Sequence, residues 1–375
     1  MSIEQLEQLV ADEPENSDAW FDLGDAYADD DRHEQAVAAY YAVIRLEQSC
    51  ASAYFNLGNA YRKLRQYEDA LEAYRQADLL APDDAATLYY IGQCFYHLSR
   101  YQDASESLER ATLLDPSDWY SFYALGNVFA EQERYVEACS AFKRAAEIDP
   151  EEADAYNQLG QTYEFLEDYD NAINAYQQAR RLTKNDPSPI FHLGRVYDWL
   201  GQNDLALAYY QQAVRLDPAY NIPLGALYQR LSRLQEAAEI FCAVIDAEPD
   251  NGNAYNMLTA EEYPDRFESA VETLLLAKSL RPNAWPIEYS LGMAYDELNR
   301  TDDAIAAFCR TVIMNPTHIG ARVQFGDCLR KAERYDEALQ VFQEIIQIRP
   351  ASDTAYRKMG ITLCRIGDHE GAAKA

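Results

Sequence analysis

Glycine recurs at a fixed interval along most of this 375-residue chain. Nine glycines fall in two runs with a spacing of 34 residues: Gly24, Gly58, Gly92, Gly126, Gly160 and Gly194, then Gly292, Gly326 and Gly360. An alanine stands twelve residues after each glycine, and six of these alanines are followed, twelve residues later, by Pro82, Pro116, Pro150, Pro218, Pro316 and Pro350. Three residue types in one register indicate a repeat array. The length therefore does not require two or three separate domains.

Each repeat is predicted to be a pair of helices. Its first half places apolar residues at i, i+3 and i+7, as in Trp20, Leu23 and Tyr27, which is one face of a helix. Its second half places an aromatic residue four positions after the alanine, as in Ala138 and Phe142. Glycine and alanine are small enough for the two helices to approach closely. The proline then ends the second helix, because it cannot continue one.

The combined pattern W-x2-L-G-x2-Y, A-x3-F/Y and P resembles the tetratricopeptide repeat, and it extends over nearly the whole chain. The resemblance implies an all-α fold, a right-handed α-solenoid superhelix of stacked helix hairpins whose first helices line a concave groove. We assign a capping helix or half-repeat to 1–14, six regular repeats to 15–218, two irregular repeats to 219–282, two regular repeats to 283–350 and a partial eleventh repeat to 351–375.

The register is disturbed between residues 219 and 270. Three residues are missing between Pro218 and Gly225, and Pro223 falls inside the shortened first helix. In the next repeat Thr259 replaces the glycine and Pro264 enters the turn. Two interpretations stay open: drift that kinks the array locally, or a hinge or specialised binding surface.

The chain is strongly acidic, with 63 Asp and Glu against 32 Lys and Arg and a formal net charge of −31. This charge argues against nucleic acid and against anionic membrane surfaces as partners, and it favours a basic protein segment. The charge is uneven, because residues 1–31 contain eleven acids and no Lys or Arg, whereas residues 320–375 contain eight acids and nine bases.

No pattern in the sequence indicates catalysis. The five histidines lack metal-ligand spacing, and there is no phosphate-binding loop or nucleophile motif. We therefore expect no enzymatic activity, no metal and no cofactor. The seven cysteines are odd in number and widely spaced, and the N-terminus has no secretory signal, which is typical of reduced thiols in a cytoplasmic protein.

Tyrosine is in excess at 29 residues, and 19 of these occupy register positions expected to pack inside the repeats. In tetratricopeptide repeats the positions three residues before and one, four and five residues after the glycine face the groove. By this resemblance the partner-binding residues are Phe21, Asp25, Phe55, Asn59, Tyr89, Gln93, Tyr96, Tyr123, Asn127, Phe191, Arg195 and Trp199. The rings offer contact area at low entropy cost, and the polar side chains suit an extended backbone. The alternative is that these rings pack on neighbouring helices, or that the chain's own coil fills the groove.

The sequence thus predicts a non-catalytic protein–protein interaction scaffold that holds a basic and apolar partner segment in its concave groove. A second hypothesis is the recognition arm of a larger enzyme or signalling protein whose effector domain lies beyond residue 375. It is favoured by an eleventh repeat that stops inside its second helix without a polar cap, as a fragment of a longer protein would. A third is a structural scaffold that self-associates through this uncapped C-terminal end.

Overall fold

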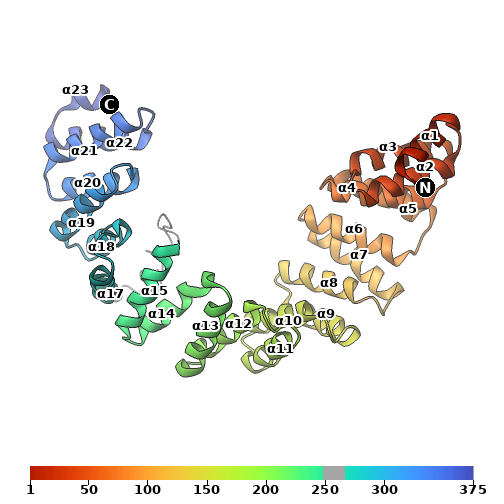
Figure 1. Ribbon diagram of the computed structural model, residues 1–375, viewed down its shortest axis with the longest axis horizontal. Helices are drawn as coiled ribbons and strands as arrows, with labels where there is room; N and C mark the ends of the chain where they lie inside the picture. Colours follow the sequence, from red (N-terminus) through yellow and green to blue (C-terminus); the bar gives the residue numbers. More distant parts are fainter. Residues whose placement is uncertain (248–266, 375) are drawn as a thin grey trace. The chain divides into compact units, whose positions relative to one another are not determined.

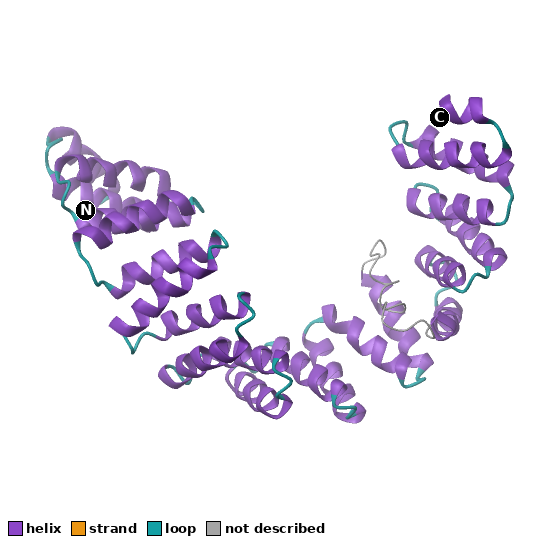
Figure 2. Cartoon of the chain, turned by 180° about the vertical axis from the view of Figure 1, so that it is seen from behind, coloured by secondary structure: helices purple, strands orange, loops and turns teal. Residues whose placement is uncertain are grey.

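The computed structural model describes residues 1–247 and 267–374. Within these ranges it contains helices and no strand, as Figures 1 and 2 show, and one of the helices is a short 3-10 helix. The predicted all-α solenoid fold is confirmed. No helix in these two ranges is long and apolar enough to cross a membrane. Thr259 and Pro264 lie outside the described residues.

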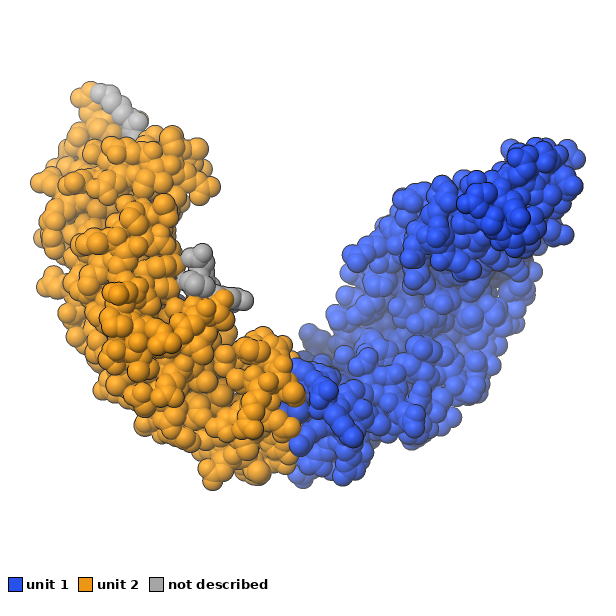
Figure 3. All heavy atoms as spheres, in the orientation of Figure 1, with its two compact units in different colours: residues 1–192 blue, residues 193–375 orange. Residues whose placement is uncertain are grey.

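The chain forms two compact units, Met1–His192 and Leu193–Ala375, which Figure 3 colours separately. Unit 1 contains α1 (Ile3–Asp12), α2 (Ser17–Asp29), α3 (His33–Leu46), α4 (Ala51–Lys63), α5 (Tyr67–Leu80), α6 (Ala85–His97), α7 (Tyr101–Leu114), α8 (Trp119–Glu131), α9 (Tyr135–Ile148), α10 (Ala153–Phe165) and α11 (Tyr169–Leu182). The boundary falls within α12 (Pro187–Trp199).

The described part of unit 2 continues with α13 (Asn203–Leu216), the 3-10 helix η1 (Pro218–Tyr220), α14 (Asn221–Arg230), α15 (Leu234–Ala247), α17 (Phe267–Leu280), α18 (Trp285–Glu297), α19 (Thr301–Met314), α20 (Ile319–Lys331), α21 (Tyr335–Ile348), α22 (Asp353–Ile366) and α23 (His369–Lys374). The repeat boundaries assigned from the sequence stay a prediction.

The recurrent glycine is the point of closest approach between the two helices of a repeat. A Cβ atom added to Gly126 on α8 would lie 2.6 Å from Cε1 of Phe142 on α9. The same overlap, at 2.5–2.7 Å, occurs in the pairs Gly24–Tyr40, Gly58–Tyr74, Gly92–Leu108, Gly160–Tyr176, Gly194–Tyr210, Gly292–Phe308 and Gly326–Phe342. The Phe142 side chain is fully buried. Each large side chain thus fills the space that a larger residue at the glycine position would need.

The turn between the two helices requires a left-handed residue. This residue stands seven positions after the glycine and is Gly201 (φ 70°) in one repeat and Glu133 (φ 59°) in another. The following backbone N–H, that of Arg134, donates to the carbonyl of Phe129 at 2.8 Å, which is a Schellman-type helix end. The guanidinium of Arg134 lies 4.3 Å from the centre of the Phe129 ring, so a cation–π contact takes the place of the usual apolar contact.

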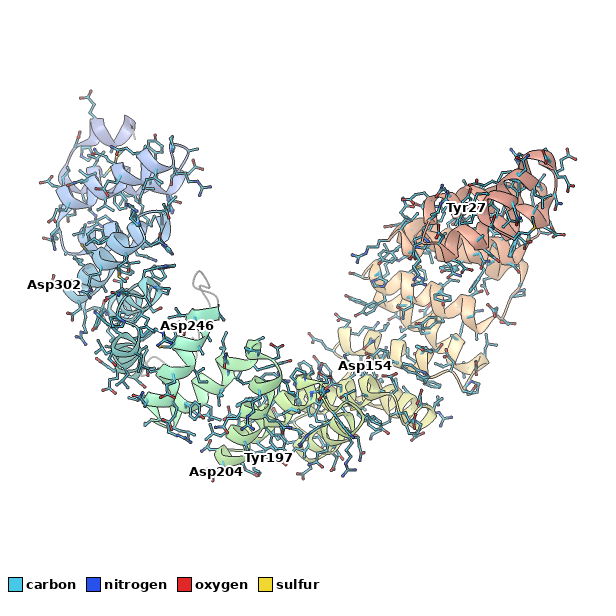
Figure 4. All side chains as sticks on the ribbon, viewed as in Figure 1. Tyr27, Asp154, Tyr197, Asp204, Asp246 and Asp302 are labelled. Carbon is cyan, nitrogen blue, oxygen red and sulfur yellow. The ribbon has the colours of Figure 1, made fainter. Side chains whose placement is uncertain are left out.

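Helix α1 covers the first repeat of unit 1. Leu6 and Val10 are buried in the same apolar cluster as Leu23 of α2. Tyr27, labelled in Figure 4 among the N-terminal helices, donates from Oη to Glu7 Oε1 of α1 at 2.6 Å. The helix is therefore held by apolar burial and by one hydrogen bond across the interface.

The first irregular repeat has the shortened first helix that the sequence predicts. Helix α14 has 10 residues, whereas α12 and α18 have 13. It starts at Asn221, directly after η1, so Pro223 lies in its first turn, where the missing N–H breaks no intrahelical hydrogen bond.

The close contact at the glycine generates a stability prediction. Glycine-to-alanine replacement in an exposed helix interior stabilises by roughly 0.5–1 kcal/mol. We expect Gly126→Ala to lower the free energy of unfolding instead, by about 1–3 kcal/mol, because the new methyl group overpacks the Phe142 ring. Urea denaturation followed by circular dichroism measures the change.

A double-mutant cycle supplies the control. In a Phe142→Ala background the space beneath the glycine is empty, so Gly126→Ala should not lower the free energy of unfolding any further. If the decreases in free energy of unfolding of the two single variants simply add in the double variant, overpacking against the ring is not the cause of the Gly126→Ala effect.

Candidate functional site

The first helices of the repeats in unit 1 contact one another as well as their own second helices. Helix α2 contacts α4, and α6 contacts α8. We call the surface of α2, α4, α6, α8 and α10 that faces away from the second helices the first-helix face of unit 1. Ten of the twelve predicted site residues lie in unit 1, from Phe21 to Phe191, whereas Arg195 and Trp199 lie in unit 2.

Three of the predicted aromatic residues, Phe21, Phe55 and Tyr123, are half-buried because each rests on the ring beneath the glycine of its repeat. Phe21 meets Tyr40 edge to face at 5.9 Å between ring centres, and Phe55 meets Tyr74 in the same way at 5.7 Å. Tyr123 meets Phe142 at 5.7 Å. One edge of each ring therefore belongs to the core of its repeat. Because the exposure is intermediate, the remaining surface stays accessible on the first-helix face.

Two of the polar residues directly after the glycine, Asp25 and Asn59, accept hydrogen bonds from the same core rings. Asp25 Oδ1 accepts from Tyr40 Oη at 2.7 Å and from Asn56 Nδ2 of the next first helix at 3.0 Å. Burial and this carboxylate raise the pKa of Tyr40 far above its ordinary value. Asn59 Oδ1 accepts from Tyr74 Oη at 2.7 Å, which leaves the amide NH₂ as the group that can donate to a partner.

The remaining predicted residues lie apart from these contacts. Gln93 and Asn127 are half-buried on α6 and α8. The Tyr96 ring lies 5.8 Å from that of Tyr101, and its Oη donates to Glu131 at 3.4 Å.

The last three predicted residues all belong to α12. Phe191 lies 5.3 Å from His192 between ring centres in unit 1. In unit 2 the Arg195 guanidinium lies 5.2 Å from the ring centre of Trp199, whose side chain is 55% exposed. The structure therefore does not bring all twelve predicted residues together in one described site.

A tyrosine that the sequence analysis did not select joins two repeats of unit 1. Tyr90 stacks on Tyr74 at 5.6 Å, with the ring planes 10° apart, and meets Phe55 edge to face at 5.6 Å. It also meets Tyr89 at 5.0 Å, and the Arg62 guanidinium lies 4.9 Å from its ring centre. Rings from α4, α5 and α6 thus form one contiguous cluster.

A pocket of about 630 Å³ opens beside this cluster. We call it the tyrosine pocket. It is lined by Arg62, Ala85, Ala86, Tyr89, Tyr90, Asp115, Ser117, Asp118 and Tyr120. Its walls come from α4, α6, α8 and the turn between α7 and α8. Tyr120 is 56% exposed and stacks on Trp119 at 4.0 Å, so an accessible ring stands opposite the α6 tyrosines.

Two carboxylates of the tyrosine pocket are oriented by the turn that carries them. Asp115 Oδ1 accepts from the backbone N–H of Ser117 at 2.9 Å and from its Oγ at 2.6 Å, and these bonds hold the pKa of Asp115 below its usual value. Asp118 caps α8 by accepting from the backbone N–H groups of Tyr120 and Ser121 at 3.2 and 3.1 Å. These hydrogen bonds fix both side chains in place.

Most residues of the tyrosine pocket are not among the site residues predicted from the sequence. Only Tyr89 was selected, because the register positions carried over from the family contain neither the turn residues nor Tyr90. The adjacent tyrosines Tyr89 and Tyr90, together with Trp119 and Tyr120 in the next repeat, are the signal that could have shown a local gathering of rings.

The first helices of unit 2 are joined in a different way. Asp296 pairs with Lys331 of the next first helix at 2.6 Å, and Asp327 pairs with Lys358 at 2.6 Å. These ion pairs connect α18 with α20 and α20 with α22. Charges along this surface of unit 2 are thus matched internally, whereas the first-helix face of unit 1 presents aromatic rings.

Comparison with known families identifies the chain. Models described as tetratricopeptide repeat match residues 2–52 and 289–353, 51–84, 120–185 and 188–220. The chain belongs to the tetratricopeptide repeat family. As a tetratricopeptide repeat array it is a protein-interaction scaffold, and proteins of this family are generally adaptors without catalytic activity.

The similar proteins share the repeat rather than a whole architecture. Superkiller protein 3 of Saccharomyces cerevisiae is 29% identical over 90 residues, which is 24% of this tetratricopeptide repeat chain and 6% of that protein. Protein FlbA of Caulobacter vibrioides is 23% identical over 144 residues, 38% of this chain and 24% of its own length. The crystal structure of YrrB, described as a TPR protein with an unusual peptide-binding site, has a TM-score of 0.45 and 23% identity, and the match covers 50% of this chain and 97% of YrrB.

The buried phenols of this array generate a pH prediction. Burial, with Tyr90 and Asp118 nearby, raises the pKa of Tyr89 to about 12, and burial also raises the pKa values of Tyr40 and Tyr74. An unfolded tyrosine ionises near pH 10. The stability that these neutral phenols contribute is therefore complete below about pH 10 and is lost as the pH rises through about 12.

Absorbance at 295 nm during alkaline titration, with circular dichroism in parallel, measures this effect. We expect exposed tyrosines to ionise near pH 10 and a second group to ionise only as helicity is lost. The chain in concentrated guanidinium chloride is the control and should show one step. One step near pH 10 with helicity intact would contradict the prediction.

Proposed function

We propose that unit 1 binds an extended segment of a protein partner along its first-helix face. The observation that carries this proposal is the row of half-exposed rings Phe21, Phe55, Tyr89 and Tyr123, one at the same register position in each of four successive first helices. Phe21, Phe55 and Tyr123 are each fixed on the core ring of their own repeat, and Tyr89 is fixed against Tyr90, so a partner would order little of the array on binding. Preorganised aromatic surface of this kind is typical of binding hot spots.

Polar groups between the rings would fix the direction of the bound segment. The Asn59 amide NH₂ can donate to a backbone carbonyl of the partner, since its oxygen is occupied by Tyr74. Gln93 and Asn127 stand at the same register position in the next two repeats. Amides at a regular spacing suit an extended backbone, and the rings beside them would accommodate its side chains.

The charge of the chain favours a partner segment that contains Lys or Arg. The formal net charge is −31, and residues 1–31 contribute eleven acids without a Lys or Arg. Long-range attraction of this kind raises the association rate of a basic partner and weakens as ionic strength rises. Contact with the rings would then determine how long the complex lasts.

Peptides selected from a display library against the full chain test this proposal. Hydrogen exchange should show peptide-induced protection in α2, α4, α6 and α8. We expect Tyr123→Ala to weaken binding about tenfold, because an aromatic anchor contributes roughly 1–2 kcal/mol. Tyr123→Phe keeps the ring and should retain most of the affinity.

Leu113→Ala is the matched control on the second helix α7, where this side chain is 80% exposed. It should leave both affinity and helicity unchanged. Protection confined to the second helices, or full affinity in Tyr123→Ala with helicity intact, would show that the segment binds elsewhere.

A further inference from the structure

We propose that the tyrosine pocket is the anchoring site for one basic side chain, an arginine or a lysine, of the partner segment. The inference rests on the proposed function, because it assigns the chemistry of one position on the same surface. Of the residues that line the pocket, only Tyr89 is among the site residues predicted from the sequence.

The pocket has the shape and lining that a long cationic side chain requires. Its volume of about 630 Å³ exceeds what one side chain occupies, so flanking backbone can enter as well. Tyr89 and Tyr90 come from α6 and Tyr120 from α8, so rings from two successive repeats face the same space. Tyrosine faces attract ammonium and guanidinium groups through their quadrupole.

The charges that line the pocket favour a cation. Asp115 and Asp118 contribute two negative charges and Arg62 one positive charge, which leaves one net negative charge in the lining. The Arg62 guanidinium already lies over the Tyr90 ring at 4.9 Å. Tyr89 and Tyr120 remain to receive a second cation, with the two carboxylates beside them.

The turn between α7 and α8 prepares the carboxylates for this role. Ser117 donates hydrogen bonds to Asp115, and the α8 backbone donates hydrogen bonds to Asp118. Neither carboxylate side chain must therefore be immobilised when a ligand binds. Orientation that precedes binding removes part of its entropic cost. The same chain also shows the required contact internally, with Arg32 over Tyr27 at 4.5 Å and Arg134 over Phe129 at 4.3 Å.

The competing ligand is a carboxylate bound to Arg62. The Nε of Arg62 is buried and lacks a hydrogen-bond acceptor, which favours an acceptor nearby. An acidic side chain would, however, meet both aspartates of the pocket and the overall charge of −31. Repulsion between like charges makes it the weaker candidate.

A single-position peptide series tests the assignment on the full chain. A fluorescein-labelled peptide from the display selection is compared in three forms, which carry arginine, its neutral isostere citrulline, or glutamate at the anchoring position. We expect the arginine form to bind about tenfold more tightly than the citrulline form, with the difference shrinking at high salt. Fluorescence polarisation gives the affinities.

Charge variants that preserve the fold locate the effect. Asp118→Ser keeps a residue that caps α8 but removes the charge, and with Asp115→Asn it should reduce the arginine-to-citrulline preference to about twofold or less. Asp84→Ser is the matched control, because Asp84 caps α6 in the same way but does not line the pocket. It should leave the preference unchanged.

Ring variants test the aromatic part independently. Tyr120 is exposed, so Tyr120→Ala should fold normally while it lowers affinity for the arginine form about fivefold, and Tyr120→Phe should not. Equal binding of the arginine and citrulline forms, or tightest binding of the glutamate form, would overturn the assignment. If the peptides protect the first helices but show no arginine preference, only this inference fails. If they do not protect the first helices, the proposed function fails with it.

Discussion

The contact between eight of the recurrent glycines and the large side chain of the following helix determines the rest of the structure. A Cβ atom at these glycines would lie 2.5–2.7 Å from that side chain, so no larger residue fits without rearrangement. The contact fixes how closely the two helices of a repeat approach. Because eight of the described repeats are built on the same contact, a residue's register in these repeats predicts where it lies.

The same buried rings also organise the surface of unit 1. Tyr40 supports Phe21 through an edge-to-face contact and holds Asp25 through its hydroxyl group, and Tyr74 does the same for Phe55 and Asn59. Core and candidate site are therefore one network rather than separate layers. Truncation of a surface ring would also remove a core contact, so binding measurements on such variants need a parallel measurement of stability.

The sequence predicts the fold well because the glycine, alanine and proline pattern, which would be weak evidence in one copy, recurs along most of the chain. It predicts the candidate site only in part, and the reason is visible at Tyr90 and Arg62. Tyr90 stands at a register position with no expected binding role, and Arg62, four residues after Gly58, was not among the predicted site residues, yet the Arg62 guanidinium reaches the Tyr90 ring of the next repeat. The left-handed turn residue was also missed, because it is glycine at position 201 but glutamate at position 133, and no residue type marks it. Contacts that depend on side-chain reach leave no fixed spacing in the sequence.

Binding at the tyrosine pocket, as proposed, would be coupled to the stability of the array. Arg62, Tyr89 and Tyr120 come from three successive first helices, α4, α6 and α8. In a solenoid each repeat is stabilised mainly by its neighbours, so the interfaces between these helices limit the local stability. A ligand that contacts all three helices binds only when both interfaces are formed. Such a ligand would therefore stabilise them by mass action, and partner binding and repeat stacking would be mutually dependent.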